Sequence, residues 1–300
     1  MTPSAQSAQA PAGVWAALTA FLLWGFSALY YRAVGSAGAF EILAHRIVWS
    51  LLFCCALILI RGRGRELAAI YADRKLLGSL LLSALLVSVN WLGYIWAVNN
   101  GHALEASMGY YLFPLVMVFL GAVILQERIS RLQRYALLLV SAGVVNLLVA
   151  LGEVPWIALL LATSFGLYGL VRKQITVGPL IGLTVECLLL SPAALLYFAF
   201  AASNGALTFG SEGIAFDLLL AGTALMTAVP LLLFTYAAKR MRLATLGMLQ
   251  YLNPSVQFLL AVTIIGEPFT SHHLYTFLLI WAGVFLFSYD SRRPERRQPL

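Results

Sequence analysis

Long apolar stretches alternate with short polar gaps along this chain, and ten such stretches can be distinguished. Each is close to the ~20 apolar residues that a helix needs to cross the hydrocarbon core of a bilayer. The stretches are Gly13–Val34, Phe40–Ile60, Leu76–Val98, Leu104–Leu125, Leu132–Ala150, Val154–Val171, Leu180–Ala201, Ile214–Ala238, Leu243–Ile265 and Leu274–Tyr289. The pattern predicts an all-α integral membrane protein with ten transmembrane helices. These form a single transmembrane domain over residues 1–300, with mobile ends at 1–12 and 291–300.

The basic residues fall in alternate gaps between these stretches. Seventeen of the 19 Lys and Arg residues occupy the even-numbered gaps and the C-terminal tail, whereas Arg32 lies on the opposite side and Arg46 within a span. Short cytoplasmic loops carry an excess of Lys and Arg, so the alternation predicts that both termini are cytoplasmic. A wrong number of spans would destroy the alternation, so it also favours ten spans in the inner (plasma) membrane.

Composition narrows the class of protein further. Hydrophobic residues make up 61% of the chain and charged residues 10%. The net charge of +7 is spread over the loops without an aromatic-basic motif, so we expect a lipid bilayer around the protein and no nucleic-acid partner. No phosphate-binding glycine motif and no metal-ligand spacing of the three cysteines occur, so we expect no cofactor and no metal. Residues 1–12 lack a basic segment, which favours a retained first span over a signal peptide.

The two halves of the chain repeat one another. When residues 94–148 are laid over 234–288, Tyr111, Pro114 and Glu127 coincide with Tyr251, Pro254 and Glu267. The repeats extend over about 13–150 and 154–290. Each holds five spans, an odd number, so the second repeat must be inverted in the membrane. Inverted repeats are typical of secondary transporters, which place their substrate near the bilayer midplane.

The repeated segment "LGAVILQERISRLQRYALLLVSAGVV" and its echo "LAVTIIGEPFTSHHLYTFLLIWAGVF" resemble the EamA family of the drug/metabolite transporter superfamily. The segments "WGFSALYYRAV" and "EILAHRIVWSLL" resemble more narrowly the RarD (chloramphenicol-sensitivity) subgroup. The resemblance covers the whole chain, and it implies export of amino acids, other metabolites or drugs. It also implies that spans 1, 3, 4, 6, 8 and 9 line a central cavity, with 2 and 7 outside them and 5 and 10 at the back.

Mid-span aromatic and amide residues are the candidate cavity lining, because aromatic walls with a few amides suit a small, partly apolar solute. Plain packing of these side chains is the alternative. Trp24 and Tyr168 join the set because the resemblance puts their spans around the cavity. The candidates are Trp24, Asn90, Trp91, Tyr94, Tyr110, Tyr111, Tyr168, Gln250, Tyr251, Asn253 and Gln257. Pro114 and Pro254 each remove a backbone donor and are candidate hinges.

Five ionisable residues are candidates for a gate or a proton site. Glu127 and Glu267 end the fourth span of each repeat, where a helix-end anchor or cap is the plainer interpretation. His45, Arg46 and Glu186 lie within spans, where ionisable groups are costly and mark functional sites by default. Structural pairing is the alternative for these three.

Spans 1, 3, 4, 6, 8 and 9 carry no charged residue near mid-membrane, which predicts a neutral cavity for solutes without net charge. The first hypothesis is a secondary transporter that exports amino acids, including neutral or aromatic ones, or related small metabolites by alternating access. The alternatives are a multidrug or other-metabolite exporter, a non-transporting sensor or assembly protein, and a membrane-embedded lipid-modifying enzyme. We expect no enzymatic activity. The small residues of spans 5 and 10 allow close contact within one chain or between two, so monomer and homodimer both stay open.

Overall fold

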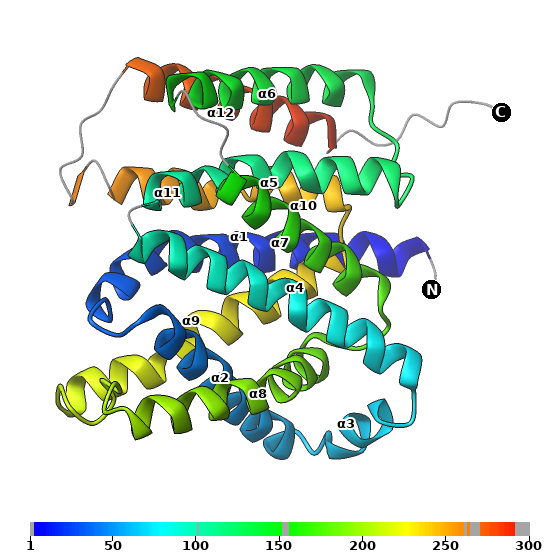
Figure 1. Cartoon of the computed structure of the whole chain (residues 1–300). Helices are drawn as coiled ribbons and strands as arrows, with labels where there is room; N and C mark the ends of the chain where they lie inside the picture. The colour runs from blue at the N-terminus through cyan, green and yellow to red at the C-terminus, as the bar shows by residue number, and fades with distance from the viewer. Residues whose placement is uncertain (1–2, 101, 152–155, 261–262, 265–270, 292–300) are drawn as a thin grey trace.

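The computed structural model describes residues 3–100, 102–151, 156–260, 263–264 and 271–291 (Figure 1). Over these residues the chain forms a bundle of helices. They are α1 (Pro3–Ala33), α2 (Ala39–Ile60), α3 (Gly64–Ile70), α4 (Arg74–Asn99), α5 (Ala103–Val123), α6 (Arg131–Leu151), α7 (Trp156–Gln174), α8 (Pro179–Ser203), α9 (Ile214–Ala238), α10 (Leu243–Leu249), α11 (Leu252–Leu260) and α12 (Ser271–Ser291).

Nine of the ten apolar stretches each coincide with one long helix, and the ninth stretch along the chain is broken into α10 and α11. The break lies at Gln250 and Tyr251, four residues before Pro254. Proline has no N–H to donate to the carbonyl of Gln250, which would be its partner in an α-helix. That carbonyl instead accepts from the N–H of Asn253 at 2.9 Å, which tightens the turn. Pro114 lies inside α5, which stays continuous.

Seven helices of the described chain are long and apolar enough to cross a membrane: α1, α2, α4, α6, α8, α9 and α12. Large apolar side chains are exposed on their outer faces, among them Leu59, Leu196 and Phe285, each more than 70% exposed. Soluble monomers rarely expose so much apolar area to water, so this surface faces lipid. The molecule is therefore a multi-pass membrane protein. Of the remaining helices, α5, α7 and the α10–α11 segment all contribute to the cavity described below.

The main contacts between a helix of the first repeat and a helix of the second have equivalent contacts between their repeat counterparts. The helix α1 packs on α9, and its repeat counterpart α7 packs on α4. Similarly α5 packs on α7, while α10 and α11 pack on α1. In Figure 1, α1 runs from right to left and α7 runs toward the right, so these counterparts point in opposite directions. The helices α2 and α8 pack on each other, as do α6 and α12.

The contact between α6 and α12 depends on two glycines. A Cβ atom at Gly283 would lie 2.6 Å from Val140 Cγ2 and 2.7 Å from the carbonyl oxygen of Ala136. A Cβ at Gly143 would lie 3.1 Å from the Thr276 carbonyl oxygen. Small residues let helix backbones approach closely in membranes. This close contact between the two helices lies within one chain.

Candidate functional site

A cavity lies between the two halves of the chain, near the middle of the long helices. Its volume is about 60 Å³, which is room for a few water molecules. The lining comes from α1, α2, α4, α5, α7 and the α10–α11 segment. These residues are Trp24, Ser27, Tyr31, Arg46, Asn90, Trp91, Tyr94, Gly109, Tyr110, Phe113, Leu161, Phe165, Gln250, Asn253 and Gln257.

Aromatic rings form most of the cavity wall, and they hold one another in place. The rings of Trp24 and Phe165 meet edge to face with centroids 5.6 Å apart, and Phe165 lies 5.2 Å from Phe113. On another wall, Tyr94 and Tyr110 meet edge to face at 5.6 Å. Edge-to-face pairs of this kind are favourable and directional. This part of the wall is therefore apolar, and its rings pack against one another.

Four amide side chains add polar groups to this wall. Asn90 Nδ2 donates to the Leu161 carbonyl oxygen at 2.8 Å, which ties α4 to α7. Gln257 Nε2 donates to Asn253 Oδ1 at 3.1 Å. The Oε1 atom of Gln250 is buried and has no hydrogen-bond partner. A buried acceptor without a partner is costly, so a donor that reached this oxygen would be stabilising.

The positive charge of the cavity comes from Arg46 on α2. Its side chain is 5% exposed, its Nε donates to Thr227 Oγ1 at 2.9 Å, and its guanidinium lies 4.5 Å from the centre of the Trp91 ring. The family resemblance placed span 2 outside the cavity and span 8 around it, yet Arg46 of α2 lines the cavity and no described residue of α9 does. The prediction of a neutral cavity is wrong for the same reason. It failed because only six spans were considered, whereas one long side chain from α2 reaches between α1 and α4.

Three of the predicted cavity residues lie elsewhere. Tyr251 is fully buried, and its hydroxyl donates to the carbonyl oxygen of Tyr111 at 2.9 Å. Both rings belong to a second core shared with α6 and α12. Tyr168 is also fully buried, and it stacks on Phe165 behind the cavity wall. These three side chains therefore pack in the core, which was the alternative interpretation.

The two prolines lie where α5 and α10–α11 approach each other. A Cβ atom at Gly247 on α10 would lie 2.9 Å from the carbonyl oxygen of Pro114. The Pro254 side of this contact carries the helix break, while the Pro114 side does not. The two prolines thus occupy matching positions of the sequence repeat, but the backbone around them differs.

Glu186 lies in a buried ion pair rather than in the cavity. Its carboxylate is 3.4 Å from Nη1 of Arg172, and it accepts hydrogen bonds from the hydroxyls of Ser83 and Tyr168. Both members of the ion pair are at most 1% exposed. The arrangement joins α4, α7 and α8, and it matches the structural pairing that the sequence left as an alternative.

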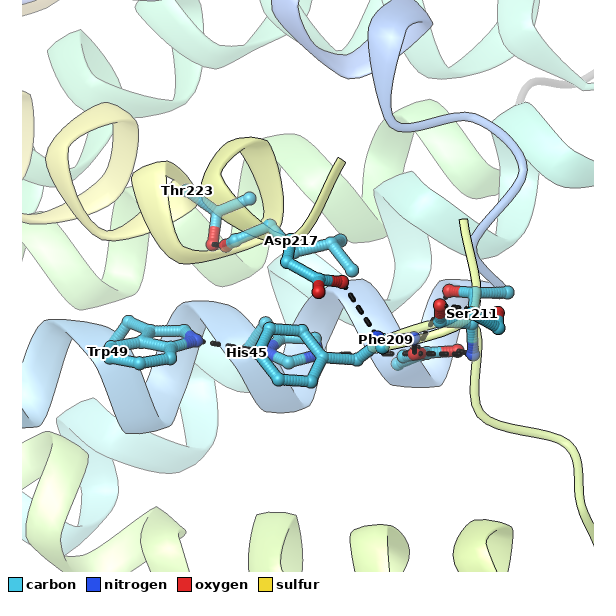
Figure 2. A network of polar contacts seen from close by, with 10 residues as sticks. His45, Trp49, Phe209, Ser211, Asp217 and Thr223 are labelled. Carbon is cyan, nitrogen blue, oxygen red and sulfur yellow. Dashed lines mark hydrogen bonds and ion pairs between the residues drawn. The ribbon is translucent and has the colours of Figure 1, made fainter. Parts of the chain in front are cut away.

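His45 faces away from the cavity and toward the loop between α8 and α9 (Figure 2). Its Nδ1 accepts from Nε1 of Trp49 at 3.0 Å, and its ring lies 4.9 Å from that of Phe209. One turn earlier, the buried carboxylate of Glu41 accepts from the backbone N–H of Thr208 and of Phe209. This cluster fastens the loop to α2, and Glu41 was not singled out from the sequence.

Glu127 caps the start of α10. Its carboxylate accepts from the N–H of Leu243 at 2.7 Å and of Ala244 at 3.0 Å, and it lies 3.9 Å from Nζ of Lys173. This is the cap or anchor that was the plainer interpretation of the residue. Its repeat partner Glu267 lies outside the described residues.

Sequence reasoning missed six residues of the cavity lining, and most of them are apolar or small. The residue types of Ser27, Tyr31 and Gly109 do not separate them from packing residues. Phe113, Leu161 and Phe165 belong to apolar runs in which every turn looks alike. The 3.6-residue period could have found Ser27 and Tyr31, because they follow Trp24 at i+3 and i+7 on one helix face. Among the described residues, no group of three or more His, Cys, Asp or Glu could hold a metal ion.

Comparison with known proteins identifies the family. A sequence model of the EamA-like transporter family matches the chain twice, at residues 11–149 and 154–289. The chain belongs to the EamA-like transporter family. An "Uncharacterized transporter" of Vibrio cholerae serotype O1 is 43% identical over 97% of this chain and 95% of its own. "Protein RarD" of Escherichia coli K12 is 41% identical over 95% and 96%.

One further relative and one solved structure are also similar to this chain. "Chloramphenicol-sensitive protein RarD" of Pseudomonas aeruginosa is 31% identical over 95% of this chain and 96% of its own. A solved structure described as "Crystal structure of protein" superposes with a TM-score of 0.71, at 20% identity, over 94% of this chain and 99% of that one. The solved structure bears on the fold alone. Family membership makes this protein a membrane transporter of small molecules and not an enzyme.

Proposed function

We propose that this protein is a secondary transporter that exports amino acids, including neutral and aromatic ones, or related small metabolites across the inner membrane by alternating access. The observation that carries the proposal is the cavity, which receives side chains from both halves of the chain. When two related halves exchange conformations, a cavity between them opens to one side of the membrane and then to the other. Its volume of about 60 Å³ is too small for an amino acid, so binding requires the lining helices to move apart.

The architecture proposed is ten spans in one domain, arranged as two inverted five-helix repeats over about 13–150 and 154–290. The double family match, at 11–149 and 154–289, supports the duplication. The opposite directions of α1 and α7 in Figure 1 support the inversion. In this scheme α10 and α11 together form one broken span, as transporters often have beside their substrate sites.

The proposed orientation has both termini in the cytoplasm. In Figure 1 the start of α1 and the end of α12 lie at the same end of the bundle as α3. The helix α3 follows Arg61 and Arg63 in the gap that carries five of the basic residues. Short loops rich in Lys and Arg stay in the cytoplasm, so this end of the bundle is the cytoplasmic one.

The test is counterflow of labelled L-phenylalanine and L-leucine in proteoliposomes, with and without a pH gradient. We expect saturable uptake driven by trapped unlabelled substrate, without ATP. Trp24→Ala removes a cavity wall and should lower the flux by up to about tenfold. Tyr135→Ala is the matched control, because Tyr135 is 64% exposed on α6. Absence of flux for every amino acid would contradict the substrate class, and drugs would then be assayed in the same vesicles.

The hinge role of the prolines has its own test. Pro254→Ala restores a donor at the break between α10 and α11, so it should straighten this span and slow counterflow. Pro114→Ala changes a helix that is already continuous, so its effect should be smaller. Unchanged flux in both variants, with unchanged thermal stability, would exclude the hinge role.

A further inference from the structure

Arg46 is held in a fixed position by three helices. Its Nε donates to Thr227 Oγ1 on α9 at 2.9 Å. The guanidinium carbon lies 4.5 Å from the ring centre of Trp91 on α4 and 5.3 Å from that of Tyr31 on α1. Arg46 therefore enters the cavity already oriented, with the side chain anchored through Nε and supported by two aromatic faces.

The charge of Arg46 has no counter-charge in the part of the chain that the structure describes. The ion pairs found there involve Arg63, Arg172, Lys173 and His45, each with a glutamate. A buried guanidinium normally has a carboxylate or phosphate partner, because its desolvation is costly. The cation–π contacts with Trp91 and Tyr31 offset only part of that cost. An anionic group that enters the cavity would complete the site.

A second unpaired group lines the same cavity. Gln250 is 1% exposed, and its Oε1 accepts no hydrogen bond. It lies at the break between α10 and α11, where the chain leaves the regular helix. The cavity therefore offers a cation, an acceptor for a hydrogen-bond donor, and aromatic walls.

We infer that Arg46 is the receptor for a carboxylate of the transported solute, and that the cavity selects small carboxylates with an apolar or aromatic body. The planar guanidinium suits a planar carboxylate, which can accept two parallel hydrogen bonds from it. A donor on the solute, such as an ammonium, would pair with Gln250 Oε1. The inference rests on the proposed function only in identifying the bound solute with the transported one.

The test measures binding by quenching of tryptophan fluorescence in detergent-solubilised protein, because Trp24 and Trp91 line the cavity. Three probes separate the groups: L-phenylalanine, L-phenylalaninamide, which lacks the carboxylate, and 3-phenylpropanoate, which lacks the amine. We expect L-phenylalanine to bind best and the amide to bind about 10- to 100-fold more weakly, the effect of losing a charged hydrogen bond. The phenylpropanoate should keep a larger share of the affinity than the amide.

Four variants assign this selectivity to Arg46. Arg46→Gln should remove the preference for the acid over the amide. Arg46→Lys keeps the positive charge but loses the planar pair of N–H donors, so it should keep part of that preference. Thr227→Val leaves Arg46 in place without its anchor and should weaken L-phenylalanine binding several-fold. The control is Arg240→Gln, since Arg240 lies over the Tyr236 ring outside the cavity lining; its affinity should stay within about twofold of the wild type.

The outcomes separate this inference from the proposed function. Equal binding of acid and amide by the wild type, or an unchanged acid preference in Arg46→Gln, would overturn the role of Arg46 even if counterflow succeeds. Carboxylate-selective binding that Arg46→Gln abolishes, without any counterflow, would support the role of Arg46 and refute transport of these solutes. If Arg46→Gln does not fold, Arg46→Lys and Thr227→Val decide, and an unchanged acid preference in both would overturn the inference.

Discussion

Two buried arginines of this protein differ in whether a carboxylate of the described residues pairs with them. Arg172 on α7 is fully buried and lies 3.4 Å from the carboxylate of Glu186 on α8. Arg46 on α2 is 5% exposed and contacts a hydroxyl and two aromatic rings. The first charge is neutralised inside the described fold, and the second is open to the cavity.

The difference teaches that burial of a charge does not by itself indicate function. A charge neutralised inside the fold joins helices, and its partner is part of the same structure. A charge left without a partner beside a cavity is a cost that a ligand can relieve. The sequence presents Arg46 and Glu186 alike, as ionisable residues within spans, and only the partner separates their roles.

The largest expected effect comes from removing the partner of Arg172. Glu186→Gln leaves this guanidinium buried without a counter-charge, and we expect a loss of about 3–5 kcal/mol of stability. Thermal unfolding in detergent measures the change. The double variant Arg172→Met, Glu186→Met should recover most of the loss, because neither charge is left behind. A Glu186→Gln protein as stable as the wild type would show that the pair does not hold α7 and α8 together.

A smaller effect is expected at Glu127, whose carboxylate accepts from two helix N–H groups and lies 3.9 Å from Nζ of Lys173. Glu127→Ala leaves the N–H groups of Leu243 and Ala244 without their acceptor, which should cost about 1–2 kcal/mol. Glu127→Gln keeps an acceptor oxygen and should cost less. If both variants are fully stable but counterflow stops, the residue acts as a gate or proton site and the cap is incidental.

Removal of Arg46 should cost little stability, unlike removal of either member of the Arg172–Glu186 pair. Arg46→Met removes a cation that leaves no carboxylate behind, so we expect stability within about 1 kcal/mol of the wild type together with loss of carboxylate binding. Arg172→Met is the matched comparison and should lose several times more stability. A strong destabilisation by Arg46→Met would mean that Arg46 is structural, and the contrast between the two arginines would fail.

A pH-dependent effect is expected at Lys239, which directly follows the end of α9. Its Nζ donates to the carbonyl oxygens of Ile175 and Val177. Burial, with Arg172 and Arg240 nearby, lowers the pKa of Lys239 to about 8 from its ordinary 10.5. The unfolded chain then holds more protons than the folded one between about pH 8 and 10.5, so this group makes stability rise with pH across that window.

Thermal unfolding of the wild type and of Lys239→Met between pH 7 and pH 10 tests this expectation. The wild type should gain stability relative to the variant as the pH rises. A constant difference between the two proteins would mean that Lys239 titrates at its ordinary pKa.

Much of the fold could be predicted from the apolar stretches, since a helix in lipid must satisfy its backbone internally and needs a fixed apolar length. The limits of α9, Ile214–Ala238, equal those of the eighth stretch. The break at Gln250 could not be placed, because Pro114 stands at the matching position of a continuous helix. Packing against neighbouring helices decides which proline interrupts its span.

The candidate site could be predicted only in part. Trp24, Asn90 and Tyr94 line the cavity, whereas Tyr111, Tyr168 and Tyr251 do not. Helix neighbours along the sequence differ by about 100° in direction, so residue type alone does not tell which tyrosine faces the cavity. His45 and Arg46 illustrate this: adjacent in sequence, they point to the α8–α9 loop and to the cavity.

The sequence by itself determined the membrane class, the duplicated halves and the family, because apolar length, repeated residues and motifs are properties of the chain. Tertiary structure alone decided which side chains share the cavity and which charges have partners. Arg46 meets Thr227 across 181 residues of chain, and Glu186 meets Ser83 across 103. Contacts at such separations depend on how the helices pack and rotate, and no local pattern encodes that.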